Sequence, residues 1–181
     1  RNFHDTKIEI SGFDAKTENG FLKADFSIQN LNKYYLTANL HSSWDLAEIN
    51  HYFEDSPFFN LQGKLSANTK YSGYISFDSK FTNYFLAANH TSKASFKEAS
   101  FTYKNFPLEF NFNTAECKFK NNRIEVETSA FTIADSDLDF AGDITDLIGY
   151  ILKKKNEIDI NGELKSTYMK FDELLTLKDT S

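Results

Sequence analysis

The chain of 181 residues is long enough for one domain of ordinary size, which buries roughly 70% of the surface that its unfolded form exposes. A net charge of −6 with scattered lysines leaves no basic patch, and this excludes a typical nucleic-acid-binding domain. The single Cys117 excludes an internal disulfide, and its neighbours predict a buried thiol. The 19 Phe and 9 Tyr, against 7 Gly and 2 Pro, favour pleated, half-buried surfaces, so the predicted fold class is mainly β.

The first predicted elements are two paired strands, near residues 6–15 and 21–30. In the second strand apolar and polar residues alternate, and Asn19-Gly20 just before it is a strong signal for a tight hairpin turn. The alternation continues through residues 36–40. Further strands are predicted from Leu61 to Tyr71, from Tyr74 to Leu86 and from Ala94 to Tyr103.

A helix followed by a strand occurs twice in the sequence. The predicted helices, at residues 45–54 and 145–153, each start beside a residue that favours a helix N-terminus and each lead into a Gly-x-Leu strand. Asp45 aligns with Asp146 and Gly63 with Gly162. Because one such unit cannot bury its own apolar face, the repeat predicts a duplicated unit whose helices occupy equivalent places.

The hairpin of residues 107–119 and 123–133 can be derived in register from a turn at Asn121-Asn122. The predicted pairs are Phe119 with Ile124, Cys117 with Val126, Ala115 with Thr128, Phe112 with Phe131 and Phe110 with Ile133. Both strands change the phase of their apolar pattern by one residue along this register. The change predicts either that the apolar residues switch face or that a bulge rotates the sheet. A strand through residues 138–144 would extend the meander into the second helix. The predicted architecture is a long, curved antiparallel sheet or groove with two short helices.

Catalytic and metal-binding patterns are nearly absent. His4, His41, His51 and His90 have no ligand spacing, so no metal site is predicted. The run Asp135, Asp137 and Asp139 lacks the glycine and distal glutamate of a calcium loop, which favours a solvated turn and strand face. Phosphate-binding loops and nucleophile elbows are missing as well, so we predict neither an enzyme nor a bound cofactor. Asn89-His90-Thr91 matches a glycosylation sequon, which matters only in a eukaryotic secretory setting.

Residues 136–175 resemble the C-terminal region of the AsmA family of Bacteroidetes-type bacteria. In that family a strand with the pattern Leu-x-Phe-x-Gly-x-Ile runs into a short helix, then into an Ile-x-Gly-x-Leu-x-Ser strand that ends in Asp-Glu-Leu-Leu. The matching residues are Leu138, Phe140, Gly142, Ile144, Leu147, Ile160, Gly162, Leu164, Ser166, Asp172, Glu173, Leu174 and Leu175. The chain then divides into a first repeat-like unit at residues 1–72, unassigned strands at 73–106 and an AsmA-like unit at 107–181.

The resemblance implies a periplasmic protein anchored in the inner membrane, with a long β-groove that is similar to those of bridge-like lipid transfer proteins. No run approaches the roughly 20 apolar residues of a membrane helix, and the chain opens without Met, so we expect a fragment whose membrane anchor lies outside it. The expected partner is phospholipid or another acyl lipid. The candidate lipid-binding residues are Phe110, Phe112, Phe131, Ile133, Phe140 and Ile144.

Three alternatives stay open. The aromatic face would form an ordinary core if the two helices and a second sheet layer covered it. A non-enzymatic envelope scaffold or outer-membrane assembly factor would instead offer its β-edges to partners. A carbohydrate-binding β-sandwich would need an exposed aromatic platform, but Trp44, the one tryptophan, lies at a predicted helix start.

Overall fold

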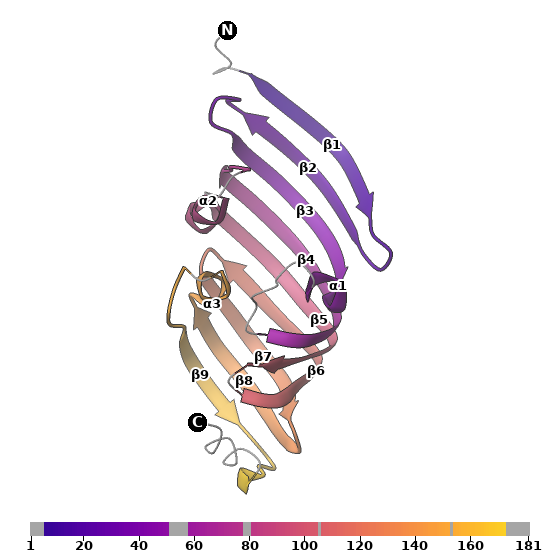
Figure 1. Cartoon of the computed structure of the whole chain (residues 1–181), viewed down its shortest axis with the longest axis vertical. Helices are drawn as coiled ribbons and strands as arrows, with labels where there is room; N and C mark the ends of the chain where they lie inside the picture. Colours follow the sequence, from indigo (N-terminus) through magenta and orange to yellow (C-terminus); the bar gives the residue numbers. More distant parts are fainter. Residues whose placement is uncertain (1–5, 51–57, 78–80, 105, 153, 173–181) are drawn as a thin grey trace.

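The structure, a computed structural model, describes residues 6–50, 58–77, 81–104, 106–152 and 154–172. Within these ranges nine strands form one antiparallel sheet in which each strand pairs with its neighbours in sequence (Figure 1). The strands are β1 Lys7–Lys16, β2 Phe21–Gln29, β3 Tyr35–Asp45, β4 Phe58–Tyr74, β5 Asn89–Tyr103, β6 Phe106–Lys120, β7 Arg123–Ile133, β8 Ser136–Thr145 and β9 Asp159–Lys165. The prediction of a mainly β fold on a long antiparallel sheet is confirmed.

Three short helices interrupt the described part of the meander, where two were predicted. They are α1 Leu46–Asn50 after β3, α2 Phe81–Ala87 after β4 and α3 Leu147–Ile151 after β8. Two of them, α1 and α3, confirm the helices predicted at residues 45–54 and 145–153. Residues 51–54 and 153 of those predictions lie outside the described residues, as do residues 173–175 of the AsmA-like pattern.

The strand predicted from Tyr74 to Leu86 is wrong, because β4 ends at Tyr74 and α2 follows. The helical signal was present, but the aromatic content of the segment also favours a strand. Four residues recur at the i, i+3, i+4, i+7 spacing of a helix, namely Phe81, Tyr84, Phe85 and Ala88. In the folded chain the ring of Phe85 lies 6.3 Å from that of Tyr71 and 5.0 Å from that of His90. The helix therefore packs on the sheet through its aromatic side.

The β6–β7 hairpin turns at Asn121-Asn122 as predicted. Four of the five predicted pairs are observed, namely Phe119 with Ile124, Cys117 with Val126, Phe112 with Phe131 and Phe110 with Ile133. The fifth is wrong by one residue, since Ala115 opposes Ser129 and not Thr128. The reason is an extra residue in β7 at this point, which sequence pairing from the turn does not reveal.

A series of β-bulges crosses β4 to β7 and keeps the apolar residues on one face. Between residues 126 and 129, β7 holds one residue more than β6 and β8; between residues 112 and 115, β6 holds one more than β7. Glu98 in β5 and Asn60 in β4 have positive φ angles of 48° and 55° where the β4–β5 register shifts. The phase change seen in the sequence is therefore a bulge and not a switch of face.

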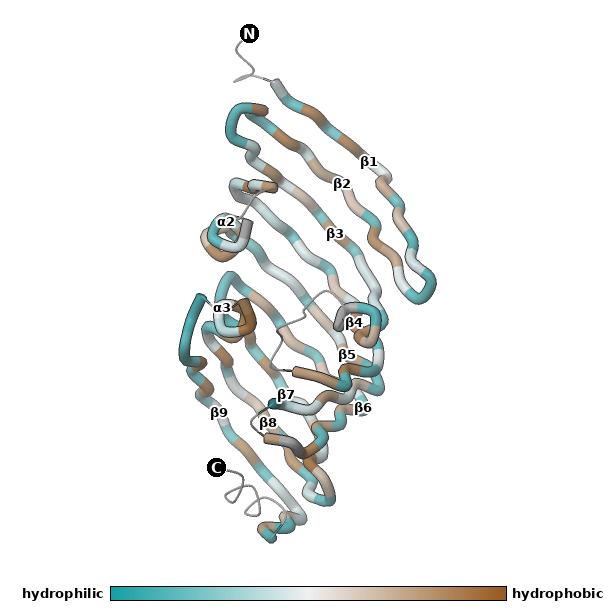
Figure 2. The backbone as a smooth tube through the Cα atoms, viewed as in Figure 1, coloured by the Kyte–Doolittle hydropathy of each residue, from teal (hydrophilic) through white to brown (hydrophobic). Residues whose placement is uncertain are grey.

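The two faces of the sheet differ in chemistry, and the register assigns each side chain to one of them, because directly opposed residues share a face. We call the side with Leu40, Phe119 and Ile124 the apolar face. The side with Lys118 and Glu125 is the polar face. Figure 2 shows the alternation as brown and teal segments along the strands.

α2 and α3 both lie over the apolar face. Under α2, Ala38, Tyr71 and Ala88 form a small buried core. On α3, the hydroxyl of Tyr150 lies 2.7 Å from that of Tyr103 at the end of β5, and the two groups share a hydrogen bond. Figure 1 shows the ends of β4 and β5 curling toward the side of the sheet on which the helices lie. The start of β4 and the end of β5 thus curl over the apolar face.

The two helix-strand units do not occupy equivalent places, so that prediction is wrong. In a meander alternate strands run in opposite directions, and α1 follows β3 whereas α3 follows β8, so the helices lie at opposite ends of the strands (Figure 1). The registers differ too. Lys64 pairs with Asp45, at the very end of β3, whereas its counterpart Glu163 pairs with Ala141 in the middle of β8. The repeat reflects a recurring strand pattern and not a superposable unit.

Candidate functional site

An aromatic cluster gathers on the apolar face where the strands curl. Phe101 stands at its centre, with ring centroids 4.9 Å from Phe110, 5.8 Å from Phe112 and 5.2 Å from Phe58. The ring of Phe131 stacks 5.1 Å from that of Phe112. Such offset contacts add to the stability that area burial provides. The cluster consists of Phe58, Phe101, Phe106, Phe110, Phe112 and Phe131.

The phenylalanines on this face are only partly covered, whereas Tyr71, Ile124, Ile133 and Leu138 are buried. No phenylalanine whose side chain the structure describes is buried, although 19 are present in the sequence. Half of the ten buried hydrophobic residues in the described ranges are alanines. A closed core buries its largest apolar residues first, because burial of a Phe or Leu side chain stabilises by about 1.5 to 3 kcal/mol. The aromatic face is therefore accessible to another apolar molecule.

A row of small side chains crosses the apolar face from β3 to β9. Its members are opposed pair by pair and are Ser42, Ala67, Ala94, Cys117, Val126, Gly142 and Gly162. Larger apolar residues flank it, including Phe119, Ile124 and Ile144 on one side and Leu65, Phe96 and Phe140 on the other. We call this strip of small side chains across the strands the channel. The hollows beside Ser100 and beside Lys93 open on the polar face.

The length of this channel suits an acyl chain. Neighbouring strands lie about 4.8 Å apart, so the six spacings from β3 to β9 cover roughly 29 Å. Each leaflet of a bilayer has a hydrocarbon layer of about 15 Å, half of the bilayer core. The row is thus long enough to hold one extended acyl chain along its whole length.

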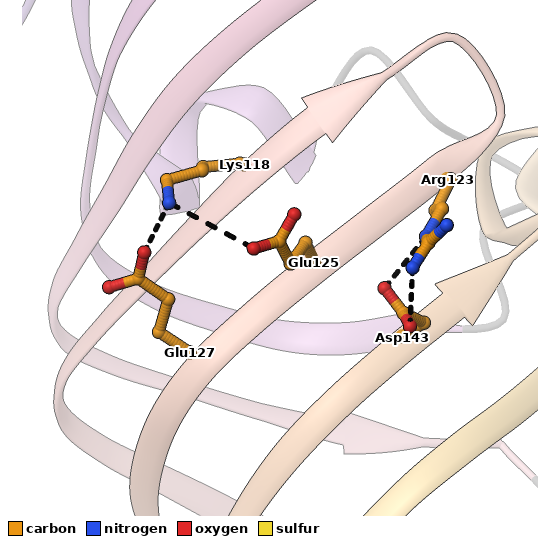
Figure 3. Close-up of polar contacts among 5 residues, drawn as sticks. All are labelled: Lys118, Arg123, Glu125, Glu127 and Asp143. Carbon is orange, nitrogen blue, oxygen red and sulfur yellow. Dashed lines mark hydrogen bonds and ion pairs between the residues drawn. The ribbon is translucent and has the colours of Figure 1, made fainter.

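The polar face carries ion pairs that need contact with water. Arg123 donates two hydrogen bonds of 2.7 Å to the carboxylate of Asp143, one from Nε and one from Nη2 (Figure 3). Lys118 contacts both Glu125 and Glu127 on the neighbouring strand. The hydrogen bond from Arg123 holds the pKa of Asp143 below its ordinary value, and the one from Lys118 does the same for Glu127. Water therefore lies on this side of the sheet.

The six predicted lipid-binding residues all lie on the apolar face. Phe110, Phe112 and Phe131 are in ring contact, and Ile133 opposes Phe110 across the β6–β7 pair. The structure does not bring the other two into this cluster. Phe140 opposes Ser129 and borders the row of small side chains; Ile144 opposes Ile124 farther along β8. The prediction thus names part of the cluster and two positions along the channel.

Three members of the cluster were missed by sequence reasoning. Phe101 lies in a predicted strand, and its alternation with Ala99 and Tyr103 was a usable signal once β5 is paired with β6. Phe106 is the first residue of β6, directly after the turn that joins β5 to β6. Phe58 had no signal, because its contact with Phe101 requires the β4–β5 pairing across the missed helix.

The histidines and acids singled out in the sequence have structural surroundings. His41 lies on the polar face with Nδ1 2.8 Å from Oδ1 of Asn68, and His90 is buried under α2, which lowers its pKa. His4 and His51 lie outside the described residues. Asp137 accepts hydrogen bonds from the backbone N–H groups of Thr167 and Tyr168 at 3.1 and 2.6 Å. Within the described ranges no three His, Cys, Asp or Glu side chains form a group that could hold a metal ion.

Comparison with protein-family models, curated proteins and solved structures found no match to this chain. Of the helices in the part of the chain that the structure describes, none has the length and apolar character needed to cross a membrane. The chemistry of the apolar face is therefore the main indication of function.

Proposed function

We propose that this protein is a non-enzymatic, AsmA-like component of the bacterial cell envelope that binds phospholipid acyl chains along its apolar face. It would lie in the periplasm, joined to the inner membrane by a segment outside this chain, and contribute to lipid transport between membranes and so to outer-membrane biogenesis. The observation that carries the proposal is that no phenylalanine whose side chain the structure describes is buried, although six of them cluster on the apolar face.

The energetics support this reading. Each methylene removed from water contributes roughly 0.8 kcal/mol, so eight to twelve methylenes in the channel would contribute about 6 to 10 kcal/mol before the entropic cost of binding. The head group would remain in water at one end of the channel, beside β3 or β9. Two of the alternatives have less support. The described strands form one sheet without a second layer, which counts against a closed core and against a β-sandwich.

A scaffold or assembly role remains the second candidate. The observation that favours it is the outer edge of β9, which no strand in the described ranges pairs with and which carries the exposed side chains of Ile160 and Leu164. An edge of this kind pairs with strands of other molecules without any need for lipid.

The test measures lipid binding by two variants, each with a new charge on one face of the sheet. Phe112→Glu puts a carboxylate among the aromatic rings, and its matched control, Asn111→Glu, puts one on the neighbouring residue, which faces the other side of the sheet. Lipid that co-purifies with each protein would be extracted and quantified by mass spectrometry. We expect a severalfold loss of lipid with Phe112→Glu and none with Asn111→Glu, while circular dichroism shows the same fold for both.

A second pair of variants fills the channel without adding charge. Ala67→Phe places a ring in the row of small side chains, and the control Asn68→Phe places one on the polar face. We expect only the first to lower lipid binding. A fatty acid that carries a diazirine group should label peptides of the apolar face in the wild-type protein. Wild-type protein without lipid and without such labelling would overturn the proposal and leave the scaffold role.

A further inference from the structure

The last strand of the sheet leaves an open edge. No described residue pairs with the outer side of β9, and all seven of its residues are exposed. On the apolar face Ile160 and Leu164 are 60% and 56% exposed. Unpaired N–H and C=O groups on a regular strand are a template for another strand, so proteins usually protect such edges.

The opposite edge of the sheet carries protection that β9 lacks. In β1 the register shifts between Ile10 and Phe13, and the N–H of Gly12, with φ of 71°, donates a 2.8 Å hydrogen bond to Asp25. A bulge of this kind turns an edge away from partners. The β8–β9 pair contains no register shift, so β9 stays straight and available.

We propose that two copies of this chain form a dimer through antiparallel pairing of their β9 edges, with the two-fold axis at Gly162. In this arrangement Asp159 of each copy faces Lys165 of the other on the polar face. Ile160 faces Leu164 on the apolar face, and Asn161 faces Glu163. Every contact occurs twice, as in any isologous interface, and opposite charges and apolar pairs across strands are both stabilising.

Neighbouring registers are less favourable for this strand. A centre at Asn161 would place Asp159 against Glu163, and a centre at Glu163 would place two glutamates against each other. Like charges directly opposed are destabilising. A shift of the pairing by one residue would bring the apolar face of one copy onto the side of the polar face of the other. The centre at Gly162 avoids both costs.

The dimer would join the two sheets with their apolar faces on the same side. Gly162 ends the row of small side chains in each copy, so the two rows would meet at the axis. The inference does not depend on lipid binding, and its test measures mass, so its failure and the failure of the proposed function are distinguishable.

The test uses charge reversal in the 181-residue chain. Analytical ultracentrifugation should show a concentration-dependent dimer for the wild type. Asp159→Lys replaces two opposite-charge pairs with two Lys–Lys pairs and should raise the dissociation constant on the order of tenfold or more. Lys165→Asp should do the same through two Asp–Asp pairs. An equimolar mixture of the two variants should dimerise again, because both pairs in the mixed dimer are then of opposite charge.

The single variants also change contacts within one chain, since Lys165 lies 3.2 Å from Glu163 and opposes Asp139. Recovery in the mixture is independent of this effect. A second readout is disulfide formation in a Cys117→Ser background. Asn161→Cys mixed with Glu163→Cys should cross-link under oxidising conditions, whereas each alone should not. A monomeric wild type, or a dimer indifferent to both charge reversals, would overturn the proposal.

Discussion

Gly63 is the position where one added methyl group should disturb the bulged part of the sheet most. Its φ is +97°, and a Cβ built there would lie 2.4 Å from the carbonyl oxygen of Glu98, 2.6 Å from Cα of Ala99 and 2.7 Å from the carbonyl oxygen of Lys97. All three are backbone atoms, so no side chain can rotate away. Gly63→Ala must therefore shift β4 against β5 at the bulge or accept the overlap.

Two terms set the expected magnitude. A non-glycine residue in a sparsely populated backbone region costs about 1 to 3 kcal/mol, and overlap in a packed site costs about 1 to 3 kcal/mol more. The free energy of unfolding should fall by about 2 to 6 kcal/mol. Gly12→Ala is the matched control, because Gly12 has φ of +71° but no atom within 4 Å of its added Cβ. It should lose only about 1 to 2 kcal/mol.

Urea unfolding followed by circular dichroism measures both variants. The fluorescence of Trp44, which precedes α1, provides a second probe of the same transition. We expect the midpoint to fall clearly further for Gly63→Ala than for Gly12→Ala. If both variants lost the same stability, the backbone conformation at Gly63 alone would explain the effect of Gly63→Ala. The overlap of the added methyl group with β5 would then contribute nothing.

Two further predictions concern titratable groups. Hydrogen bonds, first from the hydroxyl of Thr167, lower the pKa of Asp137 in the folded protein. The ionised carboxylate therefore stabilises the fold at pH values above its ordinary pKa of about 4. This stabilisation is lost as the pH falls through the lower pKa of the folded state. The stability difference between wild type and Asp137→Asn, measured by urea unfolding, should thus shrink below pH 4; a constant difference would contradict this. Burial raises the pKa of the Cys117 thiol to about 11, so its alkylation at pH 8 should be on the order of a hundredfold slower in the folded protein than in urea. Similar rates in both states would contradict it.

Local pattern was enough for much of the fold. The alternation of polarity placed most strands, and the turn at Asn121-Asn122 was enough to pair Phe119 with Ile124, because a two-residue turn leaves little freedom in register. The same local logic placed α1 and α3. Since the period of side chains along a strand is two, it also placed Phe110 and Phe112 on one face of their strand, but it left open whether that is the face of Ile144.

The tertiary structure decided features that depend on distant partners. Phe81 and Phe85 fit a helix by their spacing and a strand by their aromatic character, and only packing against Tyr71 settles which forms. That helix also changes the number of strands between the two repeat-like units, and in a meander this number decides whether two helices lie at the same end or at opposite ends. The repeat in the sequence therefore does not predict at which end of the strands each helix lies.

The candidate site was likewise predicted only in part from the sequence. Sequence determined that Phe110, Phe112 and Phe131 lie together, because they belong to one hairpin. The bulges in four neighbouring strands, the curl that brings Tyr103 to Tyr150, and the arrival of Phe58 beside Phe101 arise from contacts between segments far apart in the chain. Whether an aromatic face is covered or open is likewise a property of every segment that packs against it, and no local pattern records it.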